Sequence, residues 1–162
     1  MKNIYFIADD FNINKIDFNK SKVIYINPTT LFGFLNGRLT REEWDLLISE
    51  VLLYLSDNLE DYSIATSTSL FIDNRNIIEH ISEMGKHVVI CYAHEDIVPE
   101  ILYKLMKSDY KDLLEGSEEY QNKYLELEKK IEESADSIKL DNVEVVRVKS
   151  ESDIQYQFNK ES

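Results

Sequence analysis

The stretch YSIATSTSLFIDNRNIIEHISEMGKHVVICYA, residues 62–93, has the pattern of a strand, a helix and a second strand. Residues 62–72 are rich in β-branched side chains and predict a strand that runs into a loop. A helix should follow, because isoleucines recur at helical spacing and Gly85 stands where helices commonly end. Residues 86–93 form a continuous apolar run, which is typical of a strand buried on both faces of a parallel sheet.

The elements before this unit continue the alternation of strands and helices. Residues 4–8 and residues 22–27 are short runs of apolar and β-branched side chains, and each run predicts a strand. Residues 29–36 predict a short helical turn. Thr40 and Glu43 then predict a capping box ahead of a long helix, whose apolar positions follow helical spacing.

The elements after the unit complete the fold prediction. Residues 142–148 alternate between apolar and polar side chains and suit a strand at or near a sheet edge. The tail that begins at Lys149 is polar, and we expect it to be loose. We therefore expect a single domain over residues 1–162, with an α/β fold built as a three-layer sandwich around a mostly parallel sheet. Residues 109–139 predict a charged helical arm, an extension near the C-terminus of this domain.

The charge of the chain narrows the class of partner. The formal net charge is −13, from 31 acids against 18 lysines and arginines. Such a chain repels nucleic acid, so we expect no direct nucleic-acid binding and a protein partner that is basic. A single cysteine, Cys91, fits a reducing compartment, and no apolar stretch is long enough to cross a membrane. We expect a cytoplasmic protein.

Acids stand directly after three of the predicted strands. Asp9 and Asp10 follow the first, Asp73 follows the third, and Asp96 comes soon after the fourth. In a parallel sheet, ligands bind beyond the carboxyl ends of the strands. Carboxylates that meet there could hold Mg²⁺, so these four are the candidate catalytic residues, and Asp9, Asp73 and Asp96 are the candidate metal ligands. The alternative for Asp73 and Asp96 is a structural role as helix N-caps.

Residues 23–105 resemble the middle of P-loop nucleotide kinases, above all the polynucleotide-kinase-like ones. The shared features begin with a strand and a short helix ahead of a long helix, followed by a strand that ends in Asp73 and a helix that bears Arg75. Residues 85–88, which begin with a glycine, then lead into an apolar strand. Residues 96–100, which contain acids and a proline, begin a further helix. The resemblance implies a parallel α/β fold and an ancestry in phosphoryl transfer.

The chain departs from this family at the phosphate-binding loop. A Walker A loop requires G-x-x-x-x-G-K-[ST], whose backbone amides hold the phosphates. Counted from Asp9, Lys15 fills the lysine position, but Asp9 and Asn14 replace the two glycines and Ile16 replaces the hydroxyl residue. The arginine-bearing lid of the family is not evident either. These departures imply that phosphoryl transfer by the family's usual route is lost.

These features lead to a first hypothesis, a catalytically degenerate P-loop-kinase-like protein. It would be an accessory or viral regulatory protein that binds a basic macromolecular partner through an acidic surface. The acidic helical segment is the candidate surface, and its candidate partner-binding residues are Glu118, Glu119, Tyr120, Tyr124, Glu126 and Glu128. Tyr120 and Tyr124 also open a narrow helical stripe with Leu127 and Ile131, which would alternatively form the seam of a homodimer or pack on the sheet.

Two enzymatic alternatives stay open. The first is an active nucleotide or polynucleotide kinase-like enzyme with an atypical phosphate loop, in which Lys15 and Arg75 bind the nucleotide and Asp73 lies near the acceptor. The second is a metal-dependent nuclease, because the acids after the first apolar strand resemble the opening of PIN or NYN-type nucleases. That resemblance implies metal binding by Asp9, Asp73 and Asp96.

Overall fold

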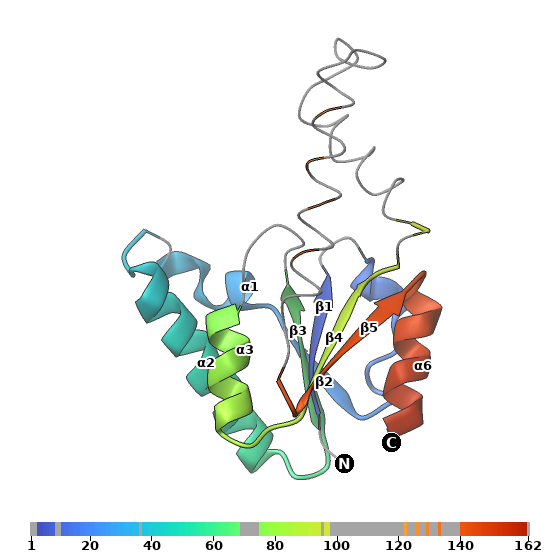
Figure 1. Ribbon diagram of the computed structural model, residues 1–162. Helices are drawn as coiled ribbons and strands as arrows, with labels where there is room; N and C mark the ends of the chain where they lie inside the picture. The colour runs from blue at the N-terminus through green and yellow to red at the C-terminus, as the bar shows by residue number, and fades with distance from the viewer. Residues whose placement is uncertain are drawn as a thin grey trace.

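The computed structural model describes residues 3–8, 11–35, 37–68, 75–94, 96–97 and 140–161, and the single residues Asn122, Glu126, Lys129 and Glu133. Five strands form one sheet in the order β2-β3-β1-β4-β5, and every pairing between neighbouring strands is parallel (Figure 1). The strands are β1 (Ile4–Ala8), β2 (Val23–Ile26), β3 (Ser63–Thr68), β4 (Val88–Ala93) and β5 (Val143–Val148).

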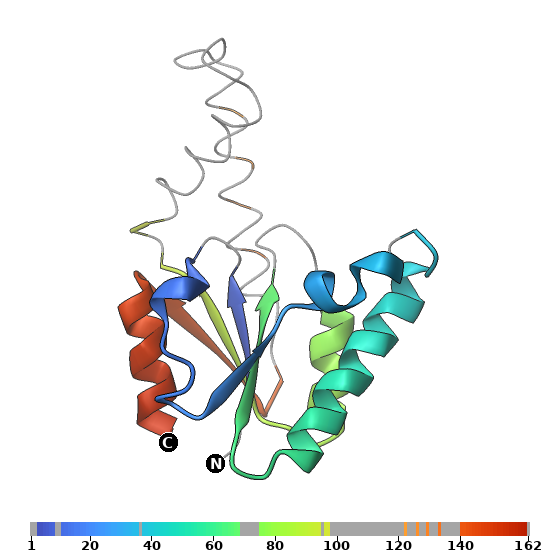
Figure 2. The ribbon, with the colours of Figure 1, turned by 180° about the vertical axis from the view of Figure 1, so that it is seen from behind.

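Helices cover both faces of this sheet. The helices α2 (Arg41–Asn58) and α3 (Arg75–Glu83) pack together on one face, and α6 (Glu151–Glu161) lies on the other (Figure 1 and Figure 2). The short α1 (Pro28–Phe32) and the 3-10 turn η2 (Gly33–Leu35) connect β2 to α2. The fold is a three-layer α/β sandwich around a parallel sheet, which confirms the fold class expected from the sequence.

The central strands β1 and β4 carry much of the core. Every residue of both strands is buried, and the register pairs Phe6 of β1 with Thr66 on one side and Ile90 on the other. Both strands are continuous apolar runs because helices cover both of their faces. Each fully buried large apolar side chain in such a core contributes about 1.5–3 kcal/mol.

The predicted start of the long helix is confirmed. The Glu43 N–H donates to Oγ1 of Thr40 at 3.1 Å, and the Thr40 N–H donates to Oε1 of Glu43 at 2.9 Å, so the capping box is complete. The hydrogen bond from the backbone of Thr40 lowers the pKa of the Glu43 carboxyl. The predicted glycine after the next helix is confirmed as well, because Gly85 follows α3 with a φ of 82°.

The expectation that the tail from Lys149 is loose is wrong. The tail forms α6, in which Ile154 and Phe158 are 0% and 1% exposed. These two side chains lie four positions apart and therefore share one face of the helix. The ring of Phe158 packs edge-on against Tyr5 of β1, with ring centroids 4.6 Å apart. The apolar face of α6 thus covers the second side of the core.

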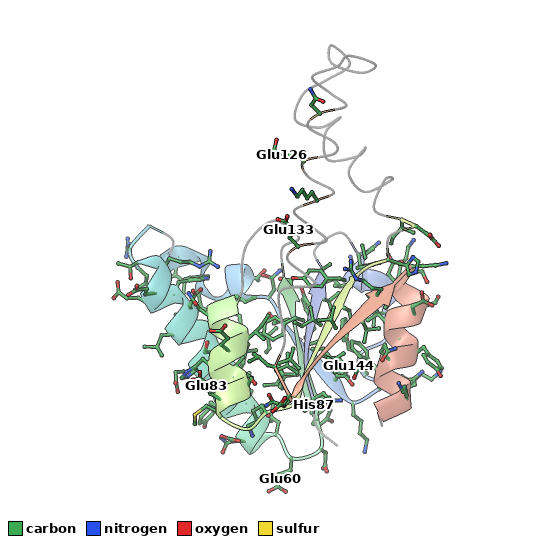
Figure 3. The ribbon with its side chains drawn as sticks, in the orientation of Figure 1. Glu60, Glu83, His87, Glu126, Glu133 and Glu144 are labelled. Atoms are coloured by element: carbon green, nitrogen blue, oxygen red, sulfur yellow. The ribbon has the colours of Figure 1, made fainter. Side chains whose placement is uncertain are left out.

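The predicted charged extension lies almost wholly outside the described residues. The four single residues of this region, Asn122, Glu126, Lys129 and Glu133, are helical and exposed, and Nζ of Lys129 lies 3.8 Å from Oε1 of Glu133. Glu126 and Glu133 lie beyond the carboxyl ends of the strands (Figure 3). The bounds 109–139 stay a prediction.

Candidate functional site at the carboxyl edge of the sheet

The strand order creates an edge of the kind where α/β proteins bind ligands. The strand β1 lies in the centre, between β3 and β4. The chain leaves β1 towards β2 on one side of the sheet, and it leaves β4 towards β5 on the other side. In open parallel sheets, ligands bind beyond the carboxyl ends of the strands, at the point where the connections diverge in this way. The candidate site is therefore the carboxyl edge of β1 and β4.

The residues predicted for this site are described in part. Asp9 and Asp10, which follow β1, and Asp73, which precedes α3, lie outside the described residues. Arg75 is the first residue of α3. Asp96 is described, and it lies in a turn just after β4. Of the four acids predicted for the site, Asp96 is therefore the one that the structure describes, and it lies at the carboxyl edge.

Asp96 is paired with a cation from the end of the neighbouring strand. Nζ of Lys149, which follows β5, lies 2.8 Å from Oδ2 of Asp96. Nδ1 of His94 lies 3.5 Å from the same oxygen and accepts the Asp96 backbone N–H at 3.1 Å. The hydrogen bond from Lys149, together with its positive charge, is the main reason why the pKa of Asp96 is lowered. A carboxylate already paired with an ammonium group is a weaker ligand for a second cation.

A metal site is not assembled by the described residues. In that part of the chain, no group of three or more His, Cys, Asp or Glu side chains is placed to hold a metal ion. Mg²⁺ is held by oxygen ligands in a near-ideal octahedron, so one paired carboxylate is a poor start for its coordination. The expected Mg²⁺ site therefore depends on Asp9 and Asp73, outside the described residues.

A carboxylate from α6 holds the loop that follows β1. The backbone N–H of Asn12 donates to Oε1 of Glu151 at 2.9 Å, although the two residues are 139 positions apart. This hydrogen bond is the main cause that lowers the pKa of Glu151, and the positive charge of Lys15 lowers it further. An anionic side chain of the protein itself thus accepts a hydrogen bond from a backbone N–H in the loop after β1.

Two more polar side chains of α6 fasten the same part of the chain. Gln155 accepts the Asp17 N–H at 2.7 Å, and its Nε2 donates to the Asp17 carbonyl at 3.0 Å and to Oγ of Ser21 at 2.7 Å. Oγ of Ser21 in turn donates to Oδ1 of Asn159 at 2.6 Å. Glu151, Gln155 and Asn159 recur every four residues and so line one stripe of the helix. We call these three residues the α6 clamp.

The sequence predictions did not include the α6 clamp or Lys149. The signal that points to the clamp is the spacing of Glu151, Gln155 and Asn159, set beside the apolar pair Ile154 and Phe158. That spacing indicates a two-sided helix, with one stripe for the core and one for a polar neighbour. The local sequence does not specify which part of the chain the polar stripe contacts.

The single cysteine lies away from this chemistry. Cys91 is fully buried in the middle of β4. Burial, and to a smaller degree the charge of Glu144, raises the pKa of its thiol to about 12. The thiol is therefore protonated at neutral pH and is no nucleophile in the folded protein.

Sequence comparison identifies no relative that would suggest a function for this chain. No protein-family model matches this chain, and no curated protein matches it. Over the residues that the structure describes, none of the helices has both the length and the apolar character needed to span a membrane. Function must therefore be inferred from the carboxyl edge and from the charge of the molecule.

Proposed function

We propose that this chain is a catalytically degenerate P-loop-kinase-like protein, which acts as an accessory regulator by binding a basic macromolecular partner. The observation that carries the proposal is the hydrogen bond from the Asn12 N–H to the Glu151 carboxylate. A cytoplasmic location belongs to the same proposal.

The Glu151 carboxylate accepts from a backbone N–H of the segment in which a working P-loop would hold phosphate. Backbone N–H groups after the first strand and a lysine hold the phosphate groups. Here the Asn12 N–H donates to Glu151, and the charge of Lys15 acts on that same carboxylate. A phosphate would have to displace Glu151 and would be repelled by its charge. This arrangement favours the degenerate protein over the active kinase-like alternative, which needs Lys15 for phosphate.

The element after the loop supports the same proposal. A P-loop leads directly into a helix, whose N-terminal N–H groups and dipole favour bound anions. In this chain, the element after β1 is the 3-10 turn η1 (Ile13–Lys15), and the next element is β2. The face of the sheet beside this connection is covered by α6, from the other end of the chain (Figure 2). A three-residue turn offers no comparable dipole.

The acidic surface is the second half of the proposal. The net charge of −13 attracts basic partners, and complementary charge speeds their association. Glu126 and Glu133 are exposed and lie beyond the carboxyl edge (Figure 3). We assign the partner contact to the predicted residues of this region, which are Glu118, Glu119, Tyr120, Tyr124, Glu126 and Glu128.

Nucleotide binding tests the first half of the proposal. The thermal unfolding of the purified chain is measured with ATP, GTP or nucleoside monophosphates, each with and without Mg²⁺. A ligand that binds only the folded state raises the unfolding midpoint, and we expect no such rise. A nucleotide-specific rise that disappears in Lys15→Ala would overturn the proposal in favour of the active enzyme. A rise with Mn²⁺ alone, lost in Asp9→Asn, would favour the nuclease.

Partner binding tests the second half with two variants of equal charge. A partner captured by the chain is identified, purified and titrated by calorimetry. The arm variant carries Glu118→Gln, Glu119→Gln, Glu126→Gln and Glu128→Gln. The control variant removes four exposed acids near the amino ends of the strands, with Glu60→Gln, Asp61→Asn, Glu83→Gln and Asp141→Asn.

We expect the arm variant to bind at least about tenfold more weakly than the control, because only the arm would face the partner. Both variants lose four negative charges, so a non-specific effect of net charge changes both affinities equally. Equal affinities would contradict the assignment of the partner surface to the arm.

A further inference from the structure

The long helix α2 exposes large apolar side chains on the face that points away from the sheet. Leu46 is 56% exposed and Tyr54 is 67% exposed. The two residues are eight positions apart, so they lie two turns apart on one face of the helix, with a separation of about 12 Å. Glu50 lies midway between them and is exposed as well. A single exposed apolar residue needs no explanation, but here the exposure recurs along one face.

The buried face of α2 is correspondingly mixed. It includes the polar residues Asp45, Ser49 and Ser56, which are 6%, 1% and 5% exposed. A helix that carries apolar side chains on more than one face is typically covered on more than one face. Within the described part of the chain, α3 and β3 pack against α2, and neither covers Leu46 or Tyr54 (Figure 1). The outward face of α2 is therefore suited to a partner.

Acids surround the two exposed apolar residues. The helix holds five acids and one arginine, so its net charge is −4 over 18 residues. The arginine, Arg41, lies with its Nε 2.9 Å from Oδ1 of the buried Asp45, and the other four acids are exposed. Each of these four lies three or four positions from Leu46 or Tyr54 and so shares their face. We define the α2 outer face as Glu42, Glu43, Leu46, Glu50, Tyr54 and Asp57.

Cations of the protein itself contact this face only at its margin. Nε2 of His80 on α3 lies 3.3 Å from Oε1 of Glu50, and Nζ of Lys86 pairs with Oδ1 of Asp57. The side chains of Glu50 and Asp57 are each still 61% exposed. Ion pairs at such exposure are weak, so both carboxylates are available to the cations of a partner.

We propose that the α2 outer face is the docking surface for a basic amphipathic helix of a partner protein. Two apolar side chains two turns apart match the apolar stripe of a helix that lies along α2. Lysines and arginines that flank this stripe meet the acids of the face, whereas acids at those positions are repelled. A second copy of the chain brings a net charge of −13 and is a poorer occupant.

The inference goes beyond the proposed function and does not depend on it. The proposed function assigns the partner contact to the predicted arm, whereas the α2 outer face lies on the described sandwich. One helix docked on another buries little surface, which places the contact among weak, transient interfaces. Charge pairs at an exposed contact are screened by salt, so the affinity should fall as ionic strength rises.

A synthetic basic helix tests the proposal on the intact chain. The probe is a fluorescent peptide of about 20 residues, long enough to form a helix, with leucines at helical spacing and lysines elsewhere. A second peptide has the same composition, but its leucines are scattered so that no stripe forms. Fluorescence anisotropy measures both affinities. We expect the striped peptide to bind at least about tenfold more tightly than the scattered peptide, and less tightly in added salt.

Two double variants of equal composition locate the contact. The face variant carries Leu46→Ala and Tyr54→Ala, and the control variant carries Leu31→Ala and Tyr156→Ala. The control residues are similarly exposed, at 49% and 65%, but they lie on α1 and α6. We expect the face variant to bind the striped peptide at least about tenfold more weakly than the control variant. Both variants should keep the unfolding midpoint of the parent chain, because each replaces exposed side chains.

The outcomes that would overturn the proposal are distinct. Failure to bind the striped peptide would remove the docking surface, and equal binding of both peptides would mean that the chain attracts positive charge alone. Equal affinities of the face and control variants would place the contact elsewhere. Sedimentation of the parent chain covers the remaining occupant, because a dimer that the face variant abolishes would assign the α2 outer face to a second copy.

Discussion

Glu151 joins the two ends of the chain through one backbone N–H. The bond from Asn12 has a charged acceptor and is therefore stronger than a bond between neutral groups. Glu151→Gln keeps the size of the side chain and removes the charge, so we expect the free energy of unfolding at pH 7 to fall by about 1 kcal/mol. Urea denaturation measures the loss. The exposed Glu144 on β5 supplies the control, because Glu144→Gln should change stability by less than about 0.5 kcal/mol.

The pKa of Glu151 sets the pH dependence of this effect. The folded state lowers the pKa, so the folded protein binds this proton less readily than the unfolded chain does. The stabilisation is complete above the unfolded-state pKa of about 4.3, and it is lost as the pH falls through the lower, folded-state value. The stability difference between the parent chain and Glu151→Gln should therefore shrink in acid. A difference that is constant down to acid unfolding would contradict the assigned bond.

Thr66 carries a buried hydroxyl group that has no hydrogen-bond partner within the described part of the chain. Its Oγ1 makes no hydrogen bond in the described structure, and the residue is 1% exposed in β3. An unpaired buried polar group costs about 1–3 kcal/mol. Thr66→Val exchanges the hydroxyl for a methyl group, and we expect it to raise the free energy of unfolding by about 1 kcal/mol. Thr66→Ser keeps the hydroxyl and loses the methyl, so it should be destabilising. A loss of stability in Thr66→Val would mean that the hydroxyl is bonded after all.

At the scale of elements, local sequence predicts the strands and misses the last helix. The strands β1 and β4 are predictable because burial on both faces requires a continuous apolar run. The helix α6 offers only two fully buried apolar residues among polar ones. Its polar contacts reach residues 134 to 139 positions earlier in the chain. No local pattern specifies a partner at that distance, so the tail looks unstructured until the whole sheet is assembled.

A substitution at one position of α6 can measure how much this helix contributes to the free energy of unfolding. Phe158 is 1% exposed and contacts the rings of Tyr5 and Phe18. Phe158→Ala should lower the free energy of unfolding by about 3–5 kcal/mol, because it leaves a cavity in the core. Tyr156→Ala, on the exposed face of the same helix, should change it by less than about 0.5 kcal/mol. Equal effects of the two substitutions in urea would mean that α6 does not pack on the sheet in solution.

For the whole molecule, the fold class could be predicted but the site could be predicted only in part. The alternation of strands and helices predicts a parallel α/β sandwich. It does not reveal that β1 is central, because strand order depends on long-range pairing. The site shows the same limit. Asp96 is predicted from its place after a strand, whereas its partner Lys149 comes from the end of another strand, 53 positions later in the chain. Contacts between distant strand ends exist only once the sheet has formed.

The net charge predicts how the folded molecule responds to salt. With 31 acids against 18 lysines and arginines, repulsion among like charges destabilises the compact state. At 0.1 M salt, interactions between exposed charges more than about 10 Å apart are largely screened, so the unfolding midpoint should rise from low to moderate NaCl. The control variant with Glu60→Gln, Asp61→Asn, Glu83→Gln and Asp141→Asn should unfold at a higher temperature in low salt and gain less from added NaCl. Calorimetry measures both midpoints. A midpoint that falls with salt would mean that attractive pairs such as Lys149–Asp96 outweigh the net repulsion.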